Sequence, residues 1–456
     1  MKNTEKKQRF GISGYRGVWG KNLTEEITFQ YALAFAKTIK EKGGSKILIA
    51  RDARPTGSHM FEAIRSAFEK EGLGYEYLGI LPTPSVLLLV KKLSYDGGIM
   101  ITASHNPAEY NGFKFFTKEG MFISPEEINE IEKIKSNLEE KEKYQKNMVV
   151  ENKVRDNTEF RKLHINEILK NIDTDLIKSK KFKVALDSIN SAGSVITREL
   201  LEELGCDIFQ INGKQDGDFT HIPEPKPENL GEIGQVVLQN KADIGFAQDP
   251  DADRLVLIDE KGKVLSEEYT LALTFKSVLR EKGGSVVMNT STSSVNEEVA
   301  LTLGAKVYRA KVGDYDVLEK VKEVDAIIGG EGGGGIIFPK INLAEDSLVG
   351  IGLILELLAR ENKKVSEIAD SLPKYFQKKE KTAFLGNLDS IYKNVKEKFP
   401  DASADELEGL RLDWVDHSWI QIRPSNTEPI IRIYGEAKSQ ERIESLFKDV
   451  MPLVSL

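Results

Sequence analysis

A serine beside a histidine, at the end of an apolar run, is the first group in this chain suited to covalent chemistry. Residues 97–107 read GGIMITASHNP, which predicts a buried strand that delivers Ser104 and His105 onto a loop. Open α/β sheets bind ligands at this end of their strands. Asn106 precedes Pro107, which disfavours helix, so we expect the Ser104 hydroxyl in an exposed turn. An ordinary turn serine fits these letters equally well. A hydrolase nucleophile fits poorly, because no G-x-S-x-G pattern surrounds it.

Three aspartates at alternate positions of QDPDADR are the second candidate: Asp249, Asp251 and Asp253. In extended backbone such side chains project to one side, and clustered carboxylates repel one another unless a cation joins them. Oxygen ligands favour magnesium or calcium, and magnesium usually accompanies phosphate chemistry. A calcium loop that uses Glu260 fails, because Arg254 stands where its sharp turn requires glycine. An acidic surface turn without an ion is the remaining alternative.

A third segment, 423–436, reads RPSNTEPIIRIYGE and combines guanidinium groups, hydroxyls and an amide. Arginine forks and short donors beside exposed backbone N–H groups suit the oxygens of a phosphate ester. The alternative is a structural loop, since serine, asparagine and threonine are ordinary turn residues. The candidate phosphate ligands are Arg423, Ser425, Asn426, Thr427 and Arg432.

The glycine-rich segment 329–335, GGEGGGG, carries one functional side chain, Glu331. Glycine lets backbone approach a ligand closely, although a loop without function is the alternative. The letters also contain G-x-G-x-x-G, but the following IIFPKIN continues as strand, so the helix of a dinucleotide site is missing. Two further cations, Arg16 in SGYRG and Lys114 in NGFKFF, are either site groups or solvated surface charges.

Alternating helices and strands are expected to position these groups. Thr24 can cap a helix that Gly43 ends, and residues 46–50, 60–71 and 74–79 then predict strand, helix and strand. This alternation predicts an α/β fold. A helix that ends in glycine before a short strand recurs later in the chain, which predicts three related units. The predicted domains are 1–150, 151–255, 256–370 and a smaller 371–456.

Composition limits the partners. A net charge of −8 disfavours nucleic acid and anionic lipid, so an anionic ligand needs local basic groups. No apolar run is long enough to cross a bilayer, so we expect no membrane partner. The single cysteine, Cys206, excludes an internal disulfide. These features favour a cytoplasmic protein, which we expect to be a monomer or a homodimer.

Together, and in this order, the Arg16 segment, TASHNP, DPDADR, the glycine-rich segment and RPSNTEP resemble the α-D-phosphohexomutase family. This family includes phosphoglucomutase, phosphomannomutase and phosphoglucosamine mutase. The resemblance spans nearly the whole chain. It implies a heart-shaped molecule with three similar mixed α/β domains and a smaller α+β C-terminal domain around a central cleft.

The resemblance also implies roles for individual residues. Hexose phosphate is the substrate, a sugar bisphosphate is the intermediate, and phosphorylated Ser104 carries the phosphoryl group. The Mg²⁺ ligands are Ser104, Asp249, Asp251 and Asp253. The transfer site is lined by Arg16, His105, Lys114 and the serine itself. Substrate binding falls to Arg254, Glu331, Gly333, Arg423, Ser425, Asn426, Thr427 and Arg432.

One departure from the family pattern concerns the glycine-rich segment. Many relatives carry Ser and His where this chain has Gly333 and Gly335, so no histidine acid or base comes from there. Lys114 and Arg16 are then the candidates for moving the hydroxyl proton and stabilising charge. The glycine-only segment and SLPKYF at 371–376 are similar to the phosphoglucosamine mutase branch. Mannose or glucose phosphate is the alternative substrate, and a non-catalytic sugar-phosphate sensor is a more remote alternative.

Overall fold

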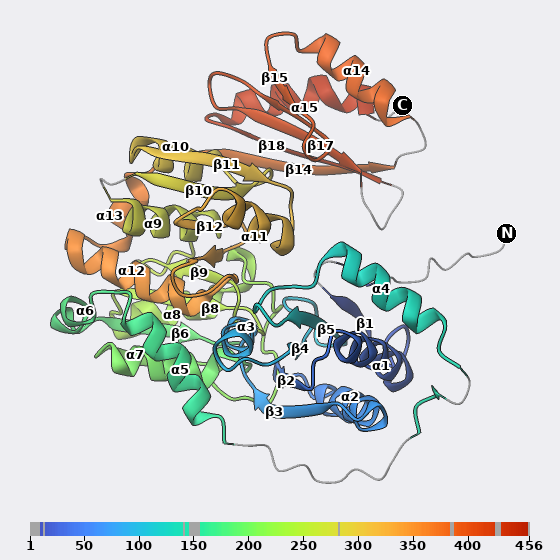
Figure 1. The fold of residues 1–456 in the computed structure, drawn as a ribbon. Coiled ribbons are helices and arrows are strands. Elements are labelled where there is room, and N and C mark those ends of the chain that lie inside the picture. Colours follow the sequence, from blue (N-terminus) through green and yellow to red (C-terminus); the bar gives the residue numbers. More distant parts are fainter. Residues whose placement is uncertain are drawn as a thin grey trace.

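Four β-sheets follow one another along the chain, and helices cover each of them (Figure 1). The computed structural model describes residues 10–11, 14–139, 142–145, 156–280, 283–383, 387–424 and 430–454. Among these, no helix combines the length and the apolar character that crossing a bilayer requires.

The N-terminal unit contains a five-stranded sheet in the order β1-β5-β4-β2-β3. Strands β2, β3 and β4 are parallel, and β5 pairs antiparallel with both β4 and β1. The predicted helix is confirmed as α1, and Thr24 Oγ1 accepts the first-turn N–H of Ile27 at 3.3 Å. The elements are β1 (Tyr15–Val18), α1 (Glu25–Glu41), β2 (Lys46–Arg51), α2 (Gly57–Glu71), β3 (Gly74–Ile80), α3 (Thr83–Lys92), β4 (Gly97–Ile101), β5 (Tyr110–Thr117) and α4 (Pro125–Ser136).

The second unit has a four-stranded sheet in the order β7-β6-β8-β9, in which β7, β6 and β8 are parallel and β9 is antiparallel. Its elements are α5 (Thr158–Leu169), α6 (Thr174–Lys180), β6 (Lys183–Asp187), α7 (Gly193–Glu203), β7 (Asp207–Ile211), the short 3-10 helix η2 (Pro227–Asn229), α8 (Gly231–Asn240), β8 (Ile244–Gln248) and β9 (Leu255–Ile258).

The third unit repeats this topology in the order β11-β10-β12-β13, again with the last strand antiparallel. Its elements are α9 (Glu268–Leu279), β10 (Gly284–Asn289), α10 (Ser294–Thr302), β11 (Ala305–Ala310), α11 (Asp314–Glu323), β12 (Ile328–Glu331), β13 (Gly335–Ile337), α12 (Ser347–Glu361) and α13 (Val365–Asp370). The expectation of related units is thereby supported by topology, and the glycine-rich segment runs from strand to strand as predicted.

This repetition explains how distant motifs come together. TASHNP follows β4, DPDADR follows β8 and the glycines follow β12. Each segment therefore lies at the same point of its sheet, between the third parallel strand and the antiparallel strand. Because the carboxyl ends of parallel strands meet at one edge of a sheet, each unit presents one candidate loop at its ligand-binding edge.

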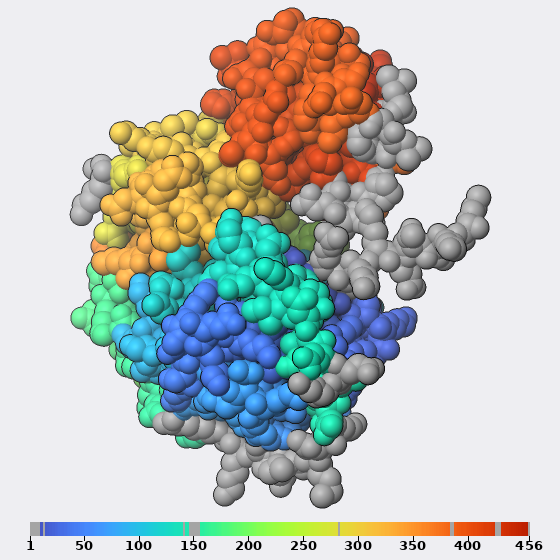
Figure 2. Space-filling view, turned by 45° about the vertical axis from the view of Figure 1, so that its right-hand side comes forward, coloured from blue at the N-terminus to red at the C-terminus, as the bar shows by residue number. Residues whose placement is uncertain are grey.

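The C-terminal unit is an antiparallel sheet in the order β14-β18-β17-β16-β15. Figure 1 places it beside β10, β11 and α10 of the third unit, and Figure 2 shows it as a separate lobe. Its elements are β14 (Phe376–Ala383), α14 (Leu388–Lys398), β15 (Ser403–Asp405), β16 (Leu410–Asp413), β17 (Trp419–Pro424), β18 (Ile430–Ala437) and α15 (Gln440–Val454).

The hydrophobic cores divide the molecule unevenly. One continuous cluster joins the second unit to the third, and another joins the N-terminal unit to the third through residues such as Phe116 and Val321. The C-terminal unit has a core of its own. Polar contacts join it to the third unit, including Ser294 N to Glu436 Oε2 at 2.7 Å. Three units thus share buried apolar surface, while the fourth contacts the third through hydrogen bonds and an ion pair.

Candidate active site

The Ser104 hydroxyl lies against the aspartate loop of the second unit. Its Oγ donates a 2.8 Å hydrogen bond to Asp249 Oδ2. Ser104 adopts a left-handed backbone conformation, with φ at 49°, and its N–H donates to Thr102 Oγ1 at 2.9 Å. Such a conformation is uncommon outside glycine and persists where the surroundings enforce it. The structure therefore brings together two candidates that lie 145 positions apart in the sequence.

The predicted exposed turn at Ser104 needs a correction. The turn is present, but the serine is only 2% exposed. Residues 97–107 show where the strand ends and say nothing about what covers the loop. The β8–β9 connection of the second unit covers it, since Asp249 is itself fully buried.

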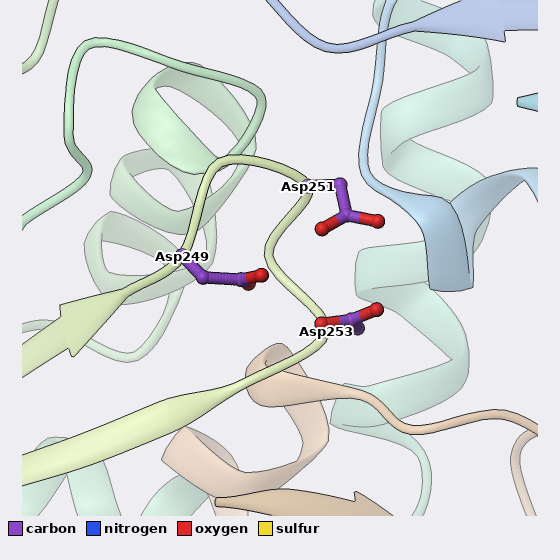
Figure 3. A group of neighbouring side chains, drawn as sticks. All are labelled: Asp249, Asp251 and Asp253. Atoms are coloured by element: carbon purple, nitrogen blue, oxygen red, sulfur yellow. The ribbon is translucent and has the colours of Figure 1, made fainter. Parts of the chain in front are cut away.

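The three aspartates surround one turn between β8 and β9 (Figure 3). Carboxylate oxygens of Asp249, Asp251 and Asp253 all lie within 4.8 Å of one another. The extended backbone expected here is wrong, because the chain turns and Ala252 takes a φ of 54°. Convergence thus comes from a tight turn and not from the alternation of side chains along a strand.

The electrostatics of the aspartate turn call for a cation. Burial, together with the neighbouring carboxylates, raises the pKa of Asp249 and of Asp253. Burial also acts to raise the pKa of Asp251, but the Lys114 ammonium outweighs it and the pKa is lowered. Within the described residues, Asp251 Oδ1 and Asp253 Oδ1 are buried and have no hydrogen-bond partner. Such oxygens, beside a serine hydroxyl, fit a hard divalent ion such as Mg²⁺.

Lys114 and Thr83 hold this turn from the N-terminal unit. Lys114 Nζ, 1% exposed, donates to Asp251 Oδ2 at 2.8 Å and to Asp253 Oδ2 at 3.1 Å. Thr83 Oγ1 donates to Asp251 Oδ2 at 2.5 Å. Burial acts to lower the pKa of Lys114, but the two carboxylates outweigh it and the pKa is raised. The lysine is therefore a fixed positive charge and not a solvated surface group.

His105 and Arg16 also lie near the serine loop. His105 Nδ1 is 3.2 Å from Ser104 Oγ, and burial, followed by Arg254 and Arg16, lowers its pKa to about 2. Arg16 Nη1 donates to Asn106 Oδ1 at 3.2 Å. The site thus combines a neutral imidazole with several guanidinium and ammonium charges.

The glycine-rich segment borders a cavity of about 270 Å³ between the second, third and C-terminal units. Glu331 Oε1 accepts hydrogen bonds from Asn289 Nδ2 and Gly313 N, both at 2.8 Å. Gly334 has a φ of 91° and a Cβ there would lie 2.5 Å from Leu255 O, so only glycine fits. Arg254, Glu331, Gly333 and Arg423 line this cavity together.

The phosphate segment is described in part. Ser425, Asn426 and Thr427 lie outside the described residues. Arg423 and Arg432 face each other as register partners of β17 and β18. The Arg423 guanidinium contacts the Glu408 carboxylate, and Lys379 and Tyr434 join it in the cavity wall.

Sequence reasoning missed several residues of the site. Arg54 lies in DARP, directly after β2. Like Ser104 after β4, it follows the carboxyl end of a parallel strand, so the strand-end rule could have indicated it. Lys226 and Lys379 add positive charge to the cavity wall but carry no local motif. Asp314 and Glu345 join Glu331 in a second carboxylate group, which no spacing in the sequence revealed.

Comparisons with known proteins agree with this architecture. Four family models match in order: Phosphoglucomutase/phosphomannomutase, alpha/beta/alpha domain I at residues 7–142, domain II at 162–262, domain III at 266–376 and the C-terminal domain at 361–453. A phosphoglucomutase/phosphomannomutase family protein from Burkholderia thailandensis superposes with a TM-score of 0.82 at 24% identity, covering 98% of this chain and 97% of that one.

Curated relatives match over nearly their full length. A phosphoglucomutase/phosphomannomutase of Thermococcus kodakarensis is 37% identical and covers 95% of both chains. A phosphoglucosamine/phosphogalactosamine mutase of Sulfurisphaera tokodaii is 36% identical over 98% of both. A phosphoglucosamine mutase of Methanococcus maripaludis is 35% identical over 98% of both. The chain therefore belongs to the phosphoglucomutase/phosphomannomutase family of phosphohexose mutases.

Proposed function

We propose that this enzyme interconverts a hexosamine 6-phosphate and its 1-phosphate through phosphorylated Ser104 and a sugar bisphosphate. The observation that carries the proposal is the 2.8 Å contact between Ser104 Oγ and Asp249 Oδ2 in a buried acidic turn. The substrate class is supported by relatives named phosphoglucosamine mutase. Glucose or mannose phosphate is the alternative.

The chemical step exchanges one ester for another. A sugar hydroxyl attacks the phosphorus on Ser104, the bond from phosphorus to Oγ breaks, and the hydroxyl proton passes to the serine oxygen. The bisphosphate then turns over and returns its other phosphoryl group to Ser104, so no phosphate is consumed. Phosphoryl transfer depends mainly on positioning and on stabilised charge.

The surrounding residues suit distinct parts of this step. His105, a neutral imidazole 3.2 Å from Ser104 Oγ, is placed to relay the proton. Lys114 is held as an ammonium by two aspartates, so it supplies charge and leaves little capacity to act as a base. A Mg²⁺ ion held by Ser104 and the three aspartates would neutralise charge on the transferring group.

The far side of the cavity suits the second phosphate. Arg423 lies at the end of β17 beside Lys379, and the candidate residues Ser425, Asn426 and Thr427 follow it in the chain. Arg254 and Glu331 line the same cavity, where they would contact the sugar. Guanidinium and ammonium groups recognise phosphate by charge, so the same wall accepts either end of the sugar.

The test is intact mass combined with turnover. Active enzyme is expected to carry about 80 Da extra on the TASHNP peptide, the mass that one phosphoryl group adds. Ser104→Ala should abolish turnover while glucosamine 6-phosphate still binds, and Ser136→Ala, at the exposed end of α4, should keep both activity and phosphate. Near-normal mutase activity in Ser104→Ala would refute the mechanism. Binding without phosphate on the serine in any form would favour the sensor alternative.

A further inference from the structure

A second group of three carboxylates lies beside the cavity, in the third unit. Oxygens of Asp314, Glu331 and Glu345 are all within 4.8 Å of one another. They come from the start of α11, the end of β12 and the residue that bridges to Ile337 of β13. We call this group the second trio. Like charges so close together are unfavourable unless a proton or a cation compensates them.

Glu345 contributes a buried carboxylate oxygen to the second trio. Its side chain is 6% exposed, and its Oε1 is buried without a hydrogen bond in the part of the chain that is described. The carboxylate fills the space beside Gly335, where a Cβ would lie only 2.0 to 2.3 Å from its atoms. An orphaned buried carboxylate oxygen costs free energy until a donor meets it. The second trio thus contains a buried acceptor oxygen that a donor group of a ligand could satisfy.

Glu331 is the member of the second trio that lines the cavity. It is held on one oxygen by Asn289 and by the Gly313 N–H. Arg254 interacts with Glu345 and Glu331. It also interacts with Asp249 and Asp253 of the aspartate turn, so its positive charge is shared between the two groups. Lys114, which pairs with Asp251 and Asp253, also interacts with Asp314, so these two cations near the second trio are shared with the aspartate turn.

A primary ammonium group matches this acceptor set. It has three N–H donors, and acceptors bound at about 2.8 Å around a tetrahedral nitrogen lie about 4.6 Å apart, inside the observed limit. We infer that Asp314 and Glu345, with Glu331, bind the protonated amino group of a hexosamine phosphate and so determine the enzyme's choice of sugar. This inference rests on the proposed function and refines its substrate.

The second trio would discriminate between sugar phosphates by the charge of the group that each carries on the amino-bearing carbon. Glucose phosphate and mannose phosphate carry a neutral hydroxyl at the same carbon, and an N-acetylated sugar carries a neutral amide. None of these groups carries a positive charge. A site with buried polar groups rejects analogues that leave those groups unpaired far more strongly than an apolar site rejects a size difference.

The test compares kcat/KM for glucosamine 6-phosphate and glucose 6-phosphate. The wild type is expected to favour the amino sugar. Glu345→Gln and Asp314→Asn should each lower that preference by about tenfold or more, the scale of one charged hydrogen bond. In both variants turnover of glucose 6-phosphate should fall by a smaller factor than turnover of glucosamine 6-phosphate. Glu319→Gln, on α11 but paired with Lys322 outside the second trio, should leave the preference unchanged.

Three results would overturn the inference. One is a preference that stays within about twofold of wild type in both variants. Another is equal use of N-acetylglucosamine 6-phosphate, since its nitrogen carries no charge. The third is equilibrium dialysis that finds two Mg²⁺ ions per chain and only one in Glu345→Gln, which would make the second trio a metal site. If Glu345→Gln unfolds, the partly exposed Asp314 still carries the test. Failure of wild-type enzyme to turn over either sugar phosphate would instead refute the proposed function.

Discussion

The guanidinium of Arg54 donates a 2.6 Å hydrogen bond to the main-chain carbonyl of Ser104. The same fully buried side chain also reaches the carbonyls of Asn106, Pro107 and Tyr110, at 2.6 to 3.0 Å, and pairs with the Asp52 carboxylate. One planar fork thus binds the whole serine loop. This explains how the left-handed conformation of Ser104 is maintained, because the loop cannot relax without breaking several charged hydrogen bonds.

Arg54→Lys tests this role, since lysine keeps the charge but loses the fork. We expect about 3 kcal/mol less free energy of unfolding, from lost charged hydrogen bonds. We also expect about tenfold or more loss of kcat, because the serine is misplaced. Urea unfolding and steady-state kinetics measure the two effects. Arg198→Lys, an exposed residue paired with Glu202, is the control and should match wild type. Unchanged kcat in Arg54→Lys would show that the fork does not position Ser104.

Asp253→Asn tests whether the aspartate turn binds Mg²⁺. Removal of one carboxylate should weaken Mg²⁺ binding about 100-fold or more, since the loss of even an outer partner of a metal ligand typically costs 10–100-fold. Calorimetric titration of Mg²⁺ into the dephosphorylated protein measures this affinity, and chelation with EDTA should stop turnover reversibly. Asp243→Asn, an exposed carboxylate beside the start of β8, should bind Mg²⁺ as wild type does. Equal affinities in the two variants would remove the metal assignment.

Glu268 should make the stability of the protein depend on pH. Burial, aided by Glu436, raises its pKa from 4.5 to about 8. The folded form therefore holds a proton that the unfolded chain has lost. This contribution to stability is complete below pH 4.5 and is lost as the pH rises through about 8, by up to about 1.4 kcal/mol per pH unit.

Glu268→Gln removes this dependence. Its amide resembles the protonated acid and can still meet Ser293 N and the Asn296 amide, which donate to Glu268 at 3.0 Å. Chemical unfolding at pH 5, 6, 7 and 8 should therefore give a flatter profile than wild type, and greater stability at pH 8. Glu267→Gln, the adjacent half-buried carboxylate, should follow the wild-type profile. Parallel profiles for wild type and Glu268→Gln would mean that Glu268 ionises normally.

Gly335→Ala tests whether the Glu345 carboxylate occupies the space beside the glycine-rich segment. The new methyl group would overlap that carboxylate, so we expect a loss of about 1–3 kcal/mol, typical of overpacking. Gly333→Ala is the matched control, because its Cβ would meet Arg254 Nη1 at a tolerable 3.4 Å. Thermal unfolding measures the stabilities of the two variants and of the wild type. Equal stabilities would place Glu345 elsewhere.

Local patterns in the sequence determined much of what the structure contains. The helix capped at Thr24, the strand that ends before TASHNP and the strand-to-strand course of the glycine-rich segment were all predictable. Their signals, capping side chains, apolar runs and glycine, act over a few residues. The sequence also determined which side chains have oxygen and nitrogen atoms suited to phosphate and magnesium.

Only the tertiary structure decided what those groups contact. Ser104 meets Asp249 across 145 positions, and Lys114 meets Asp251 across 137, because the first and second units bring these side chains together. The burial of Ser104 was mispredicted for the same reason, since it is not a local property. Glu345 shows this most clearly. Its neighbours belong to other elements, so only packing reveals that its oxygen has no hydrogen-bond partner among the residues the structure describes.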